Sequence, residues 1–507
     1  MAVLTDTLKK AIQVVREYVP VPEINEIGEV TEVQDGVISI AGLKEAMMGE
    51  MLIFPHGLKG QVFNLEKERI SCILFGDHSL IHQGDRVFRT NRVLEVPVGD
   101  ELLGRIIDPL GNPLDGKPIP DCRHKRPIMQ QASEVIQRQP VHRPLFTGIK
   151  TIDAMIPLGK GQRELIIGDR RTGKTTIAID TIINQKGKNV VCVYVAIGKR
   201  LSAITEMIDI LKRYNALAYT IIVSTSAEDS PAFLYLAPYS GCTIAEFFMN
   251  GGQDVLVVYD DLSKHAVAYR SLSLLMRRSP GRESYPGDIF YLHSRLLERS
   301  AQLSDDLGGG SMSALPIVET QEGDISAYIP TNIISITDGQ IYLESNLFAK
   351  GFLPPINIGL SVSRVGGEAQ TPIMKKVARR LRLDLAQYFE LEDFARFSSE
   401  LDVITARQLE HGKRVLELTT QIQYQPLDIS LEILAVYAAT QGLIDHVPLP
   451  LIKKWEASLY QKAISEKADL LNELWKEKEL DSKFEQEIKE FIRTFTEHFL
   501  LQENVQS

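Results

Sequence analysis

Residues 168–175 read Gly-Asp-Arg-Arg-Thr-Gly-Lys-Thr and have the spacing G-x-x-x-x-G-K-T, which is typical of a loop that binds phosphate groups. Glycines at these positions would let the backbone approach a polyphosphate and direct N–H groups toward it. Lys174 would reach the β and γ phosphates of a nucleotide, and the Thr175 hydroxyl would ligate Mg²⁺. The candidate nucleotide-binding residues are Gly168, Asp169, Arg170, Arg171, Thr172, Gly173, Lys174 and Thr175.

The segments on either side of this loop support the same interpretation. Residues 164–167 are mostly apolar and predict a short buried strand, and residues 176–183 predict the opening of an apolar helix. The positive end of that helix dipole would add to the attraction for phosphate. A chance glycine-rich turn is the alternative, and the strand before it and the helix after it count against that alternative.

Asp260 is the candidate for a second metal contact. It ends the apolar run 255–259, and in ATPases with a phosphate-binding loop an aspartate at such a strand end holds Mg²⁺, directly or through water. The alternative is an ordinary acidic strand end. Its position downstream of the phosphate-binding loop favours the metal role, and Asp261 is the weaker candidate.

The composition limits the class of protein. The chain has 507 residues, enough for roughly three domains of about 150 residues each. The formal net charge of −10 argues against a general nucleic-acid binder, but it is compatible with a local basic groove. The four cysteines form no C-x-x-C pair, so neither a zinc ribbon nor a disulfide framework is indicated. No signal peptide and no apolar stretch of about 18 residues is evident, so membrane attachment would go through partners.

The first part of the chain predicts two small units. Residues 1–22 carry an apolar stripe at helical spacing and predict an N-terminal helical segment, which would pack on the next domain or dock a partner helix. Residues 23–94 alternate short apolar runs with turns, and Asp35-Gly36 is a strong hairpin signal. We expect a small β-barrel there.

The rest of the chain predicts two larger domains. Residues 95–370 alternate strands and helices, which predicts an α/β domain with a mostly parallel sheet whose ligands bind at the carboxyl ends of strands. Residues 371–507 predict a helical domain. The strands expected after the loop are residues 190–197, 219–223, 255–259, 314–318 and 333–336. The helices expected near the end are residues 374–388, 408–421, 451–465 and 473–500, the last with an aromatic stripe that we expect to pack in a core.

Longer strings in the central region carry a resemblance to a known family. They are GQRELIIGDR (161–170), YDDLSK (259–264), RRSPGRE (277–283), YPGD (285–288), YLHSRLLER (291–299), ISITDGQ (334–340) and SVSRVG (361–366). On these strings the whole chain resembles the alpha subunits of F-type ATP synthases, with a looser match in the barrel and helical regions. Strings of this length are far more specific than the phosphate-binding loop alone.

The resemblance implies a multidomain fold and a place in a large complex. The fold would be an N-terminal β-barrel, a central RecA-like α/β domain with the phosphate-binding loop, and an all-α C-terminal domain. Three alpha and three beta subunits would form a ring around a rotating gamma shaft, held by peripheral stalk subunits. The alpha subunit would bind ATP or ADP with Mg²⁺ at a regulatory, non-catalytic site. The complex would couple ATP synthesis or hydrolysis to H⁺ or Na⁺ transport at the cytoplasmic face of a bacterial inner membrane, with an organelle membrane as the alternative.

The resemblance also implies roles for residues outside the loop. Arg364, with its neighbours Ser361, Val362 and Ser363, matches the family's arginine finger, which stabilises charge on the γ-phosphate of a neighbouring subunit. Ser335 matches a serine near that phosphate, and Gln421 and Gln423 match the glutamines beside the adenine. From composition alone, Arg364 would be a structural ion-pair residue, Ser335 a plain strand serine, and the glutamines solvated helix-end residues.

Two positions depart from the family pattern. Lys199 stands where catalytic relatives carry a glutamate that orients water and where the usual alpha subunit has glutamine, and Arg171 stands where the usual alpha subunit has glutamine. A charged lysine cannot accept a proton from water, so we expect no hydrolysis at this chain's own site. Both changes add positive charge, which would tighten nucleotide binding or replace Mg²⁺ in part. They suggest a divergent or second-copy alpha subunit.

Two other function classes share parts of this pattern. A self-sufficient RecA-like hexameric ATPase, such as a secretion motor, would need a catalytic base where Lys199 stands. An RNA helicase of the transcription-termination type also joins a barrel to such a domain, but the acidic charge and a barrel without clustered aromatic residues argue against it.

Overall fold

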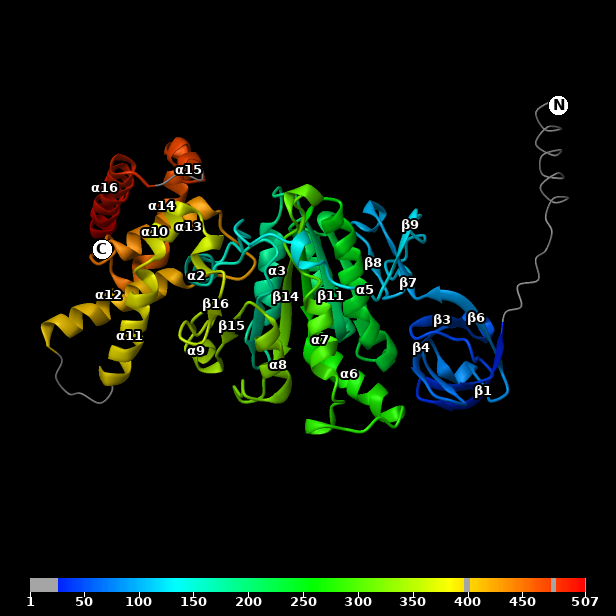
Figure 1. Cartoon of the computed structure of the whole chain (residues 1–507). Helices are drawn as coiled ribbons and strands as arrows, with labels where there is room; N and C mark the ends of the chain where they lie inside the picture. Colours follow the sequence, from blue (N-terminus) through cyan, green and yellow to red (C-terminus); the bar gives the residue numbers. More distant parts are fainter. Residues whose placement is uncertain (1–25, 396–401, 476–479, 507) are drawn as a thin grey trace, which may run out of the picture. The chain divides into compact units, whose positions relative to one another are not determined.

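The computed structural model describes residues 26–395, 402–475 and 480–506. The chain divides into two compact units, Met1–Leu94 and Glu95–Ser507 (Figure 1). The expected fold class is confirmed, because a β-barrel is followed by an α/β region and then by helices. The predicted N-terminal helical segment, residues 1–22, lies outside the described residues.

The first unit contains a closed antiparallel barrel with the strand order β1-β2-β5-β4-β3-β6. Asp35 and Gly36 both have positive φ values, 37° and 87°, as the expected two-residue hairpin turn requires. Glu50 is fully buried beside Arg89, whose Nε and Nη2 donate to its two carboxylate oxygens at 3.0 and 3.1 Å. The strands are β1 (Ile27–Gln34), β2 (Val37–Ala41), β3 (Glu50–Ile53), β4 (Lys59–Leu65), β5 (Ile70–Phe75) and β6 (Arg86–Val93).

The second unit is built on an eight-stranded sheet with the order β16-β15-β10-β14-β13-β11-β12-β8. Every neighbouring pair is parallel except β15 and β16, so the expected mostly parallel sheet is confirmed. A separate antiparallel pair joins β7 (Glu95–Val98) to β9 (His124–Pro127). The strands of the large sheet are β8 (Ile106–Ile107), β10 (Leu165–Gly168), β11 (Val190–Lys199), β12 (Thr220–Ser226), β13 (Asp254–Asp260), β14 (Ser311–Glu319), β15 (Gly339–Leu343) and β16 (Val362–Ser363).

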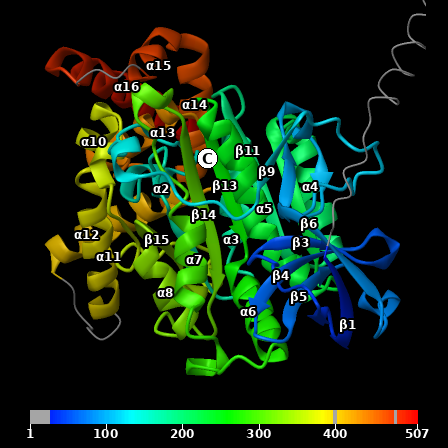
Figure 2. The ribbon, with the colours of Figure 1, turned by 45° about the vertical axis from the view of Figure 1, so that its right-hand side comes forward.

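Helices cover both faces of this sheet (Figure 2). Alternate residues of a strand point to opposite faces. Cys192 and Tyr194 of β11 share a core with apolar residues of α3 and α4, whereas a Cβ at Gly241 of α5 would lie 2.3 Å from Val195, so α5 packs closely on the other face. The helices are α2 (Lys150–Met155), α3 (Lys174–Asn184), α4 (Leu201–Arg213), α5 (Pro231–Asn250), α6 (Leu262–Leu275), α7 (Ile289–Leu297), α8 (Tyr328–Ile336) and α9 (Ser345–Ala349).

One predicted strand is wrong. Residues 333–336 form the last turn of α8, and the strand that pairs with β10 is β15, which begins at Gly339. A short apolar run rich in β-branched residues fits a strand or a buried helix equally well. Here the backbone N–H and hydroxyl of Thr337 both donate to the Ile333 carbonyl, at 3.0 and 2.9 Å, and close the helical turn.

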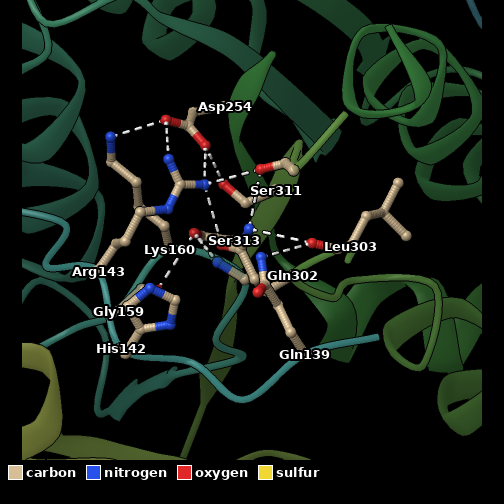
Figure 3. A network of polar contacts seen from close by, with 12 residues as sticks. Gln139, His142, Arg143, Gly159, Lys160, Asp254, Gln302, Leu303, Ser311 and Ser313 are labelled. Carbon is tan, nitrogen blue, oxygen red and sulfur yellow. Dashed lines mark hydrogen bonds and ion pairs between the residues drawn. The ribbon is translucent and has the colours of Figure 1, made fainter. Parts of the chain in front are cut away.

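A polar network holds the end of the sheet where β13 begins (Figure 3). The Asp254 carboxylate accepts hydrogen bonds from Arg143 Nη2, Lys160 Nζ and Ser311 Oγ, each at 2.7 Å. Burial acts to raise the pKa of Asp254, but these donors, Lys160 first, lower it below its ordinary value. The network joins the residues before β10 to β13 and β14, and the opposite, carboxyl ends of the strands remain for ligand binding.

The chain ends in a group of helices, drawn from yellow to red in Figure 1. They are α10 (Pro372–Ala378), α11 (Leu381–Ala395), α12 (Val403–Thr419), α13 (Ile429–Thr440), α14 (Ile452–Glu466), α15 (Ala468–Trp475) and α16 (Ser482–Gln506). The prediction of one helix over residues 374–388 is wrong in extent. Both helices contact α2 and α13, but α10 packs mainly on α13 and α11 mainly on α12, so tertiary contacts turn the chain where local propensity would continue a helix.

The aromatic stripe expected near the C-terminus does pack in a core. Phe495 and Phe499 of α16 are buried, and the ring centroid of Phe495 lies 6.0 Å from that of Trp455 in α14. The Trp455 Nε1–H donates to Thr496 Oγ1 at 3.1 Å. Throughout residues 26–395, 402–475 and 480–506, no helix is both long and apolar enough to cross a membrane.

Candidate nucleotide-binding site

The predicted phosphate-binding loop connects the end of β10 to the start of α3. Gly173 precedes the helix with φ 97°, a conformation that favours glycine, and Arg171 also has a positive φ, 62°. Residues 171–175 line a cavity. Asp169 anchors the loop to the neighbouring strands, because its carboxylate accepts from Thr320 Oγ1 at 2.7 Å and from Ser345 Oγ at 2.9 Å. Burial acts to raise the pKa of Asp169, but these hydrogen bonds lower it below its ordinary value.

The Lys174 side chain folds back across this loop. Its Nζ donates to the carbonyl of Gly168 at 2.8 Å and to that of Asp169, and the side chain is buried. Burial lowers the pKa of Lys174, and nearby carboxylates oppose that shift. The ammonium therefore lies against carbonyl oxygens of the loop, and the Lys174 side chain lines a cavity.

Asp260 lies directly beside the loop. Its Oδ2 accepts from Thr175 Oγ1 at 2.7 Å and from the Tyr194 hydroxyl at 2.6 Å. Its Oδ1 forms an ion pair with Lys199 Nζ. Burial acts to lower the pKa of Lys199, but Asp260 and Asp261 raise it above its ordinary value, so this ammonium is charged at neutral pH.

A cavity of about 960 Å³ opens from the loop toward the C-terminal helices. This is large enough for a nucleotide, since small-molecule sites commonly measure about 300–1,000 Å³. The polar end carries Lys174, Thr175, Lys199, Asp260 and Glu319. The far end is more apolar and is formed by Phe348, Leu353, Pro354, Pro355, Ile422, Leu427 and Ala457, among others.

Gln421 and Gln423 both line this far end, but the side-chain amide of Gln421 already forms hydrogen bonds with backbone groups. Its Nε2 donates to the carbonyls of Gly148 at 2.7 Å and Gln425 at 3.0 Å, and its Oε1 accepts from the Lys150 N–H at 3.2 Å. Gln421 thus joins the segment before α2 to the segment after α12. Gln423 is the exposed member of the pair and the better placed of the two to contact a base.

The residues expected at a neighbouring active site lie elsewhere. Those lining the cavity, within the part of the chain that the structure describes, do not include Arg364 or Ser335. The Arg364 side chain is exposed just after the edge strand β16, and its backbone N–H donates to the Asp338 carbonyl at 2.8 Å. Ser335 is exposed on α8, a helix and not the strand we expected, and its hydroxyl donates to the Asn332 carbonyl at 2.7 Å.

The neighbours of Arg364 brace this edge. The buried Ser361 hydroxyl donates to the Asn357 carbonyl at 2.6 Å and accepts from the Tyr342 N–H at 2.9 Å. The Ser363 hydroxyl donates to the Pro157 carbonyl at 2.8 Å. Val362 is largely exposed on the same strand. The two serines hold the backbone in place, and the guanidinium that follows them faces solvent.

Comparison with known proteins agrees with this architecture. The family model described as ATP synthase alpha/beta family, beta-barrel domain, matches residues 23–91, the nucleotide-binding domain model matches residues 148–363, and the C-terminal domain model matches residues 370–495. The chain is also 52% identical over 502 residues to ATP synthase subunit alpha of Aquifex aeolicus (strain VF5), covering 99% of this chain and all of that protein.

The chain belongs to the alpha subunits of the ATP synthase alpha/beta family. In this alpha subunit, residues 171–175 and Asp260 line one cavity at the carboxyl end of the sheet. The donor set of the Thr175 hydroxyl and the Asp260 carboxylate fits Mg²⁺, which prefers oxygen ligands. No cluster of three or more His, Cys, Asp or Glu side chains suited to a metal occurs among the described residues.

Sequence analysis did not identify three parts of the cavity wall in this alpha subunit. Lys150 and Glu456 form a buried ion pair across two helices. Asp180 on α3 is buried, and burial raises its pKa to about 7. Glu319, at the end of β14, forms a 3.1 Å ion pair with Arg170. Glu319 could have been identified from one signal. It is a charged residue at the end of β14, the strand beside β13, which ends at Asp260.

Proposed function

We propose that this chain is the regulatory, non-catalytic alpha subunit of a rotary ATP synthase, which binds ATP or ADP in its own cavity and supplies Arg364 to a catalytic site on a neighbouring beta subunit. The observation that carries this proposal is the separation of two sets of groups. The cavity holds the phosphate-binding loop, Lys174 and Thr175, whereas Arg364 faces solvent at the edge strand. An arginine that acts on a neighbour's nucleotide needs such an exposed position.

The cavity has the groups to hold a nucleotide, and two charged side chains at the strand ends beside the loop, Lys199 and Glu319, form ion pairs. Lys199 forms an ion pair with Asp260, and Glu319 forms one with Arg170. A base must accept a proton from the attacking water, which a charged lysine cannot do and a carboxylate paired with arginine does poorly. Bound Mg²⁺ would neutralise phosphate charge, with Thr175 and Asp260 as the residues that hold it.

The complex in which this subunit would act follows from its relatives. ATP synthase subunit alpha is the name of its Aquifex aeolicus relative. We infer a ring of three alpha and three beta subunits around a gamma shaft, with peripheral stalk subunits, that makes ATP from ADP and phosphate with a transmembrane H⁺ or Na⁺ gradient, or pumps ions by hydrolysis. The chain would be a peripheral subunit at the cytoplasmic face of the membrane.

Replacement of Arg364 by alanine in the reconstituted complex tests the proposal. We expect steady-state ATP turnover to fall about 10³-fold, the size of effect known for arginine fingers. Nucleotide bound to this chain should be retained, because Arg364 does not line its cavity. Arg213→Ala, at an exposed arginine near the end of α4, is the matched control and should leave turnover unchanged.

Two results would contradict the proposal. Unchanged turnover in the Arg364 variant would remove the trans arginine role. Sustained ATP hydrolysis by the purified chain alone would favour a self-sufficient RecA-like ATPase, the alternative that the Lys199–Asp260 ion pair argues against.

A further inference from the structure

We propose that the Lys199 ammonium is a built-in cation of this nucleotide site, which takes over part of the charge neutralisation that Mg²⁺ supplies, so that the chain binds nucleotide with little dependence on divalent metal. This inference rests on the proposed nucleotide-binding function. It assigns a specificity-determining role to a lysine that stands at the carboxyl end of β11.

The sheet register brings Lys199 to the metal-binding end of the site. β11 pairs with β13 so that Ala196 is opposite Asp260, and the pairing of β11 with β12 becomes irregular between Ala196 and Lys199. Gly198 has φ 59°, and its N–H donates to the Thr225 hydroxyl oxygen at 3.1 Å. This bend directs the Lys199 side chain to Asp260 Oδ1 and into the cavity wall, with 18% of the side chain exposed.

Both carboxylate oxygens of Asp260 contact protein groups in this arrangement. Thr175 and Tyr194 donate to one carboxylate oxygen, and Lys199 pairs with the other. A divalent cation approaching this carboxylate would meet an ammonium already in contact with it, and like charges at short range in a buried site repel strongly. Mg²⁺ binding would therefore require Lys199 to move away from Asp260.

The same ammonium is well placed for a phosphate. Lys199 and Lys174 line the polar end of the cavity together with the exposed Arg171. A cation that pairs with a carboxylate and also faces the cavity can donate to a phosphate oxygen with another of its three N–H groups. Lys174 and Lys199 then contribute two positive charges at the end of the cavity where the terminal phosphates would lie.

A purely structural role makes a different prediction. If Lys199 only neutralises the negative charge of the buried Asp260 carboxylate, its loss should lower the stability of the fold without changing how nucleotide affinity depends on Mg²⁺. If it acts as a cation toward phosphate, its loss should make nucleotide binding depend on the metal. The dependence on Mg²⁺ separates the two roles.

The test is equilibrium dialysis of radiolabelled ATP against the purified full-length chain, in excess MgCl₂ and in EDTA. For the wild-type chain we expect the two Kd values to agree within about tenfold. Lys199→Gln should raise the ratio of the EDTA value to the Mg²⁺ value by roughly 10- to 100-fold, the range for one charge-assisted hydrogen bond. Lys199→Arg, which keeps the charge, should restore much of the wild-type ratio.

Lys212→Gln, at an exposed lysine of α4, is the control and should leave the ratio unchanged. An unchanged ratio in Lys199→Gln, with binding retained, would overturn the role of Lys199 alone. The wild-type measurement keeps the proposal falsifiable even if that variant does not fold, because a wild-type ratio of about 10³ or more would also overturn it. Absence of ATP binding by the wild-type chain in both conditions would overturn the proposed nucleotide site itself.

Discussion

Replacement of Lys150 by methionine tests how the α/β region and the C-terminal helices are joined around the cavity. Lys150 begins α2, and only 2% of its side chain is exposed. Its Nζ forms an ion pair with Glu456 of α14 and donates to the carbonyl of Leu418, near the end of α12, at 2.5 Å. Burial lowers the pKa of Lys150 to about 8, and Glu456 opposes that shift, so the ammonium is charged at pH 7.

The size of the effect follows from what remains in the variant. Methionine keeps most of the aliphatic volume but leaves the Leu418 carbonyl without its donor and removes one partner of Glu456. Removing one partner of a buried ion pair costs about 3–5 kcal/mol. Glu456 would keep Lys453 Nζ at 3.0 Å and the Tyr460 hydroxyl at 2.8 Å, so we expect the lower end, about 3 kcal/mol, or roughly a 150-fold change in an equilibrium constant.

Hydrogen exchange of the α14 amides in the full-length chain measures this free energy locally. Lys150→Met should lower protection of these amides by roughly 150-fold, the equivalent of about 3 kcal/mol. Lys454→Met is the matched control on the same helix, because its ion pair with Glu503 is exposed on the lysine side. An exposed pair contributes about 0–1 kcal/mol, so the control should change protection by less than about fivefold.

A double-mutant cycle supplies the refutation. Glu456→Gln should also weaken α14, and the double variant should lose about 2 kcal/mol less than the sum of the two single losses, because both remove the same contact. Additive effects, or a Lys150→Met loss no larger than that of Lys454→Met, would refute the conclusion that this ion pair stabilises the cavity wall.

Two further predictions concern buried carboxyl groups. Burial raises the pKa of Asp180 to about 7, whereas an unfolded aspartate titrates near about 4, so between these pH values the folded protein holds a proton that the unfolded chain has lost. Wild-type stability should therefore fall by up to about 4 kcal/mol as pH rises through this window. Asp180→Asn removes the titrating carboxyl group, so it should raise the calorimetric Tm more at pH 8 than at pH 5. An equal gain in Tm at both pH values would contradict this prediction. In the barrel, Arg89→Met leaves the buried Glu50 without its guanidinium and should cost about 3 kcal/mol, seen as faster hydrogen exchange in β3 and β6. Arg69→Met, at an exposed pair in the same barrel, should have little effect, and a similar loss in both variants would count against the role of burial.

Much of the fold was predictable because it depends on local patterns. The Asp35-Gly36 turn, the buried strand ending at Asp260 and the strand-loop-helix around Lys174 each depend on residues adjacent in the chain. The errors arose where a local pattern allowed two structures. The apolar run 333–336 became a helix, and the helix expected over 374–388 was divided because its two parts have different main neighbours, α13 for the first and α12 for the second.

The candidate site divides in the same way. Lys174 and Thr175 were identified from spacing, and they do lie in one cavity with Asp260. Composition predicted that the Gln421 side chain is solvated, and the family resemblance predicted that it lies beside adenine. In the structure, its amide forms hydrogen bonds with backbone groups of residues far away in the chain. No spacing rule could reveal this, because its partners are brought near only by packing of α2 against the C-terminal helices.

From the sequence we could predict a phosphate-binding loop, the order of barrel, α/β region and helices, and an unusual lysine at position 199. The contact that this lysine makes depends on the packed fold, because parallel strands β11 and β13 place residues far apart in the chain at the same edge of the sheet. There Lys199 pairs with the buried carboxylate of Asp260, which a metal would otherwise use, while Arg364 is left outside the cavity. Electrostatic roles depend on distance and burial, and these are properties of the packed fold.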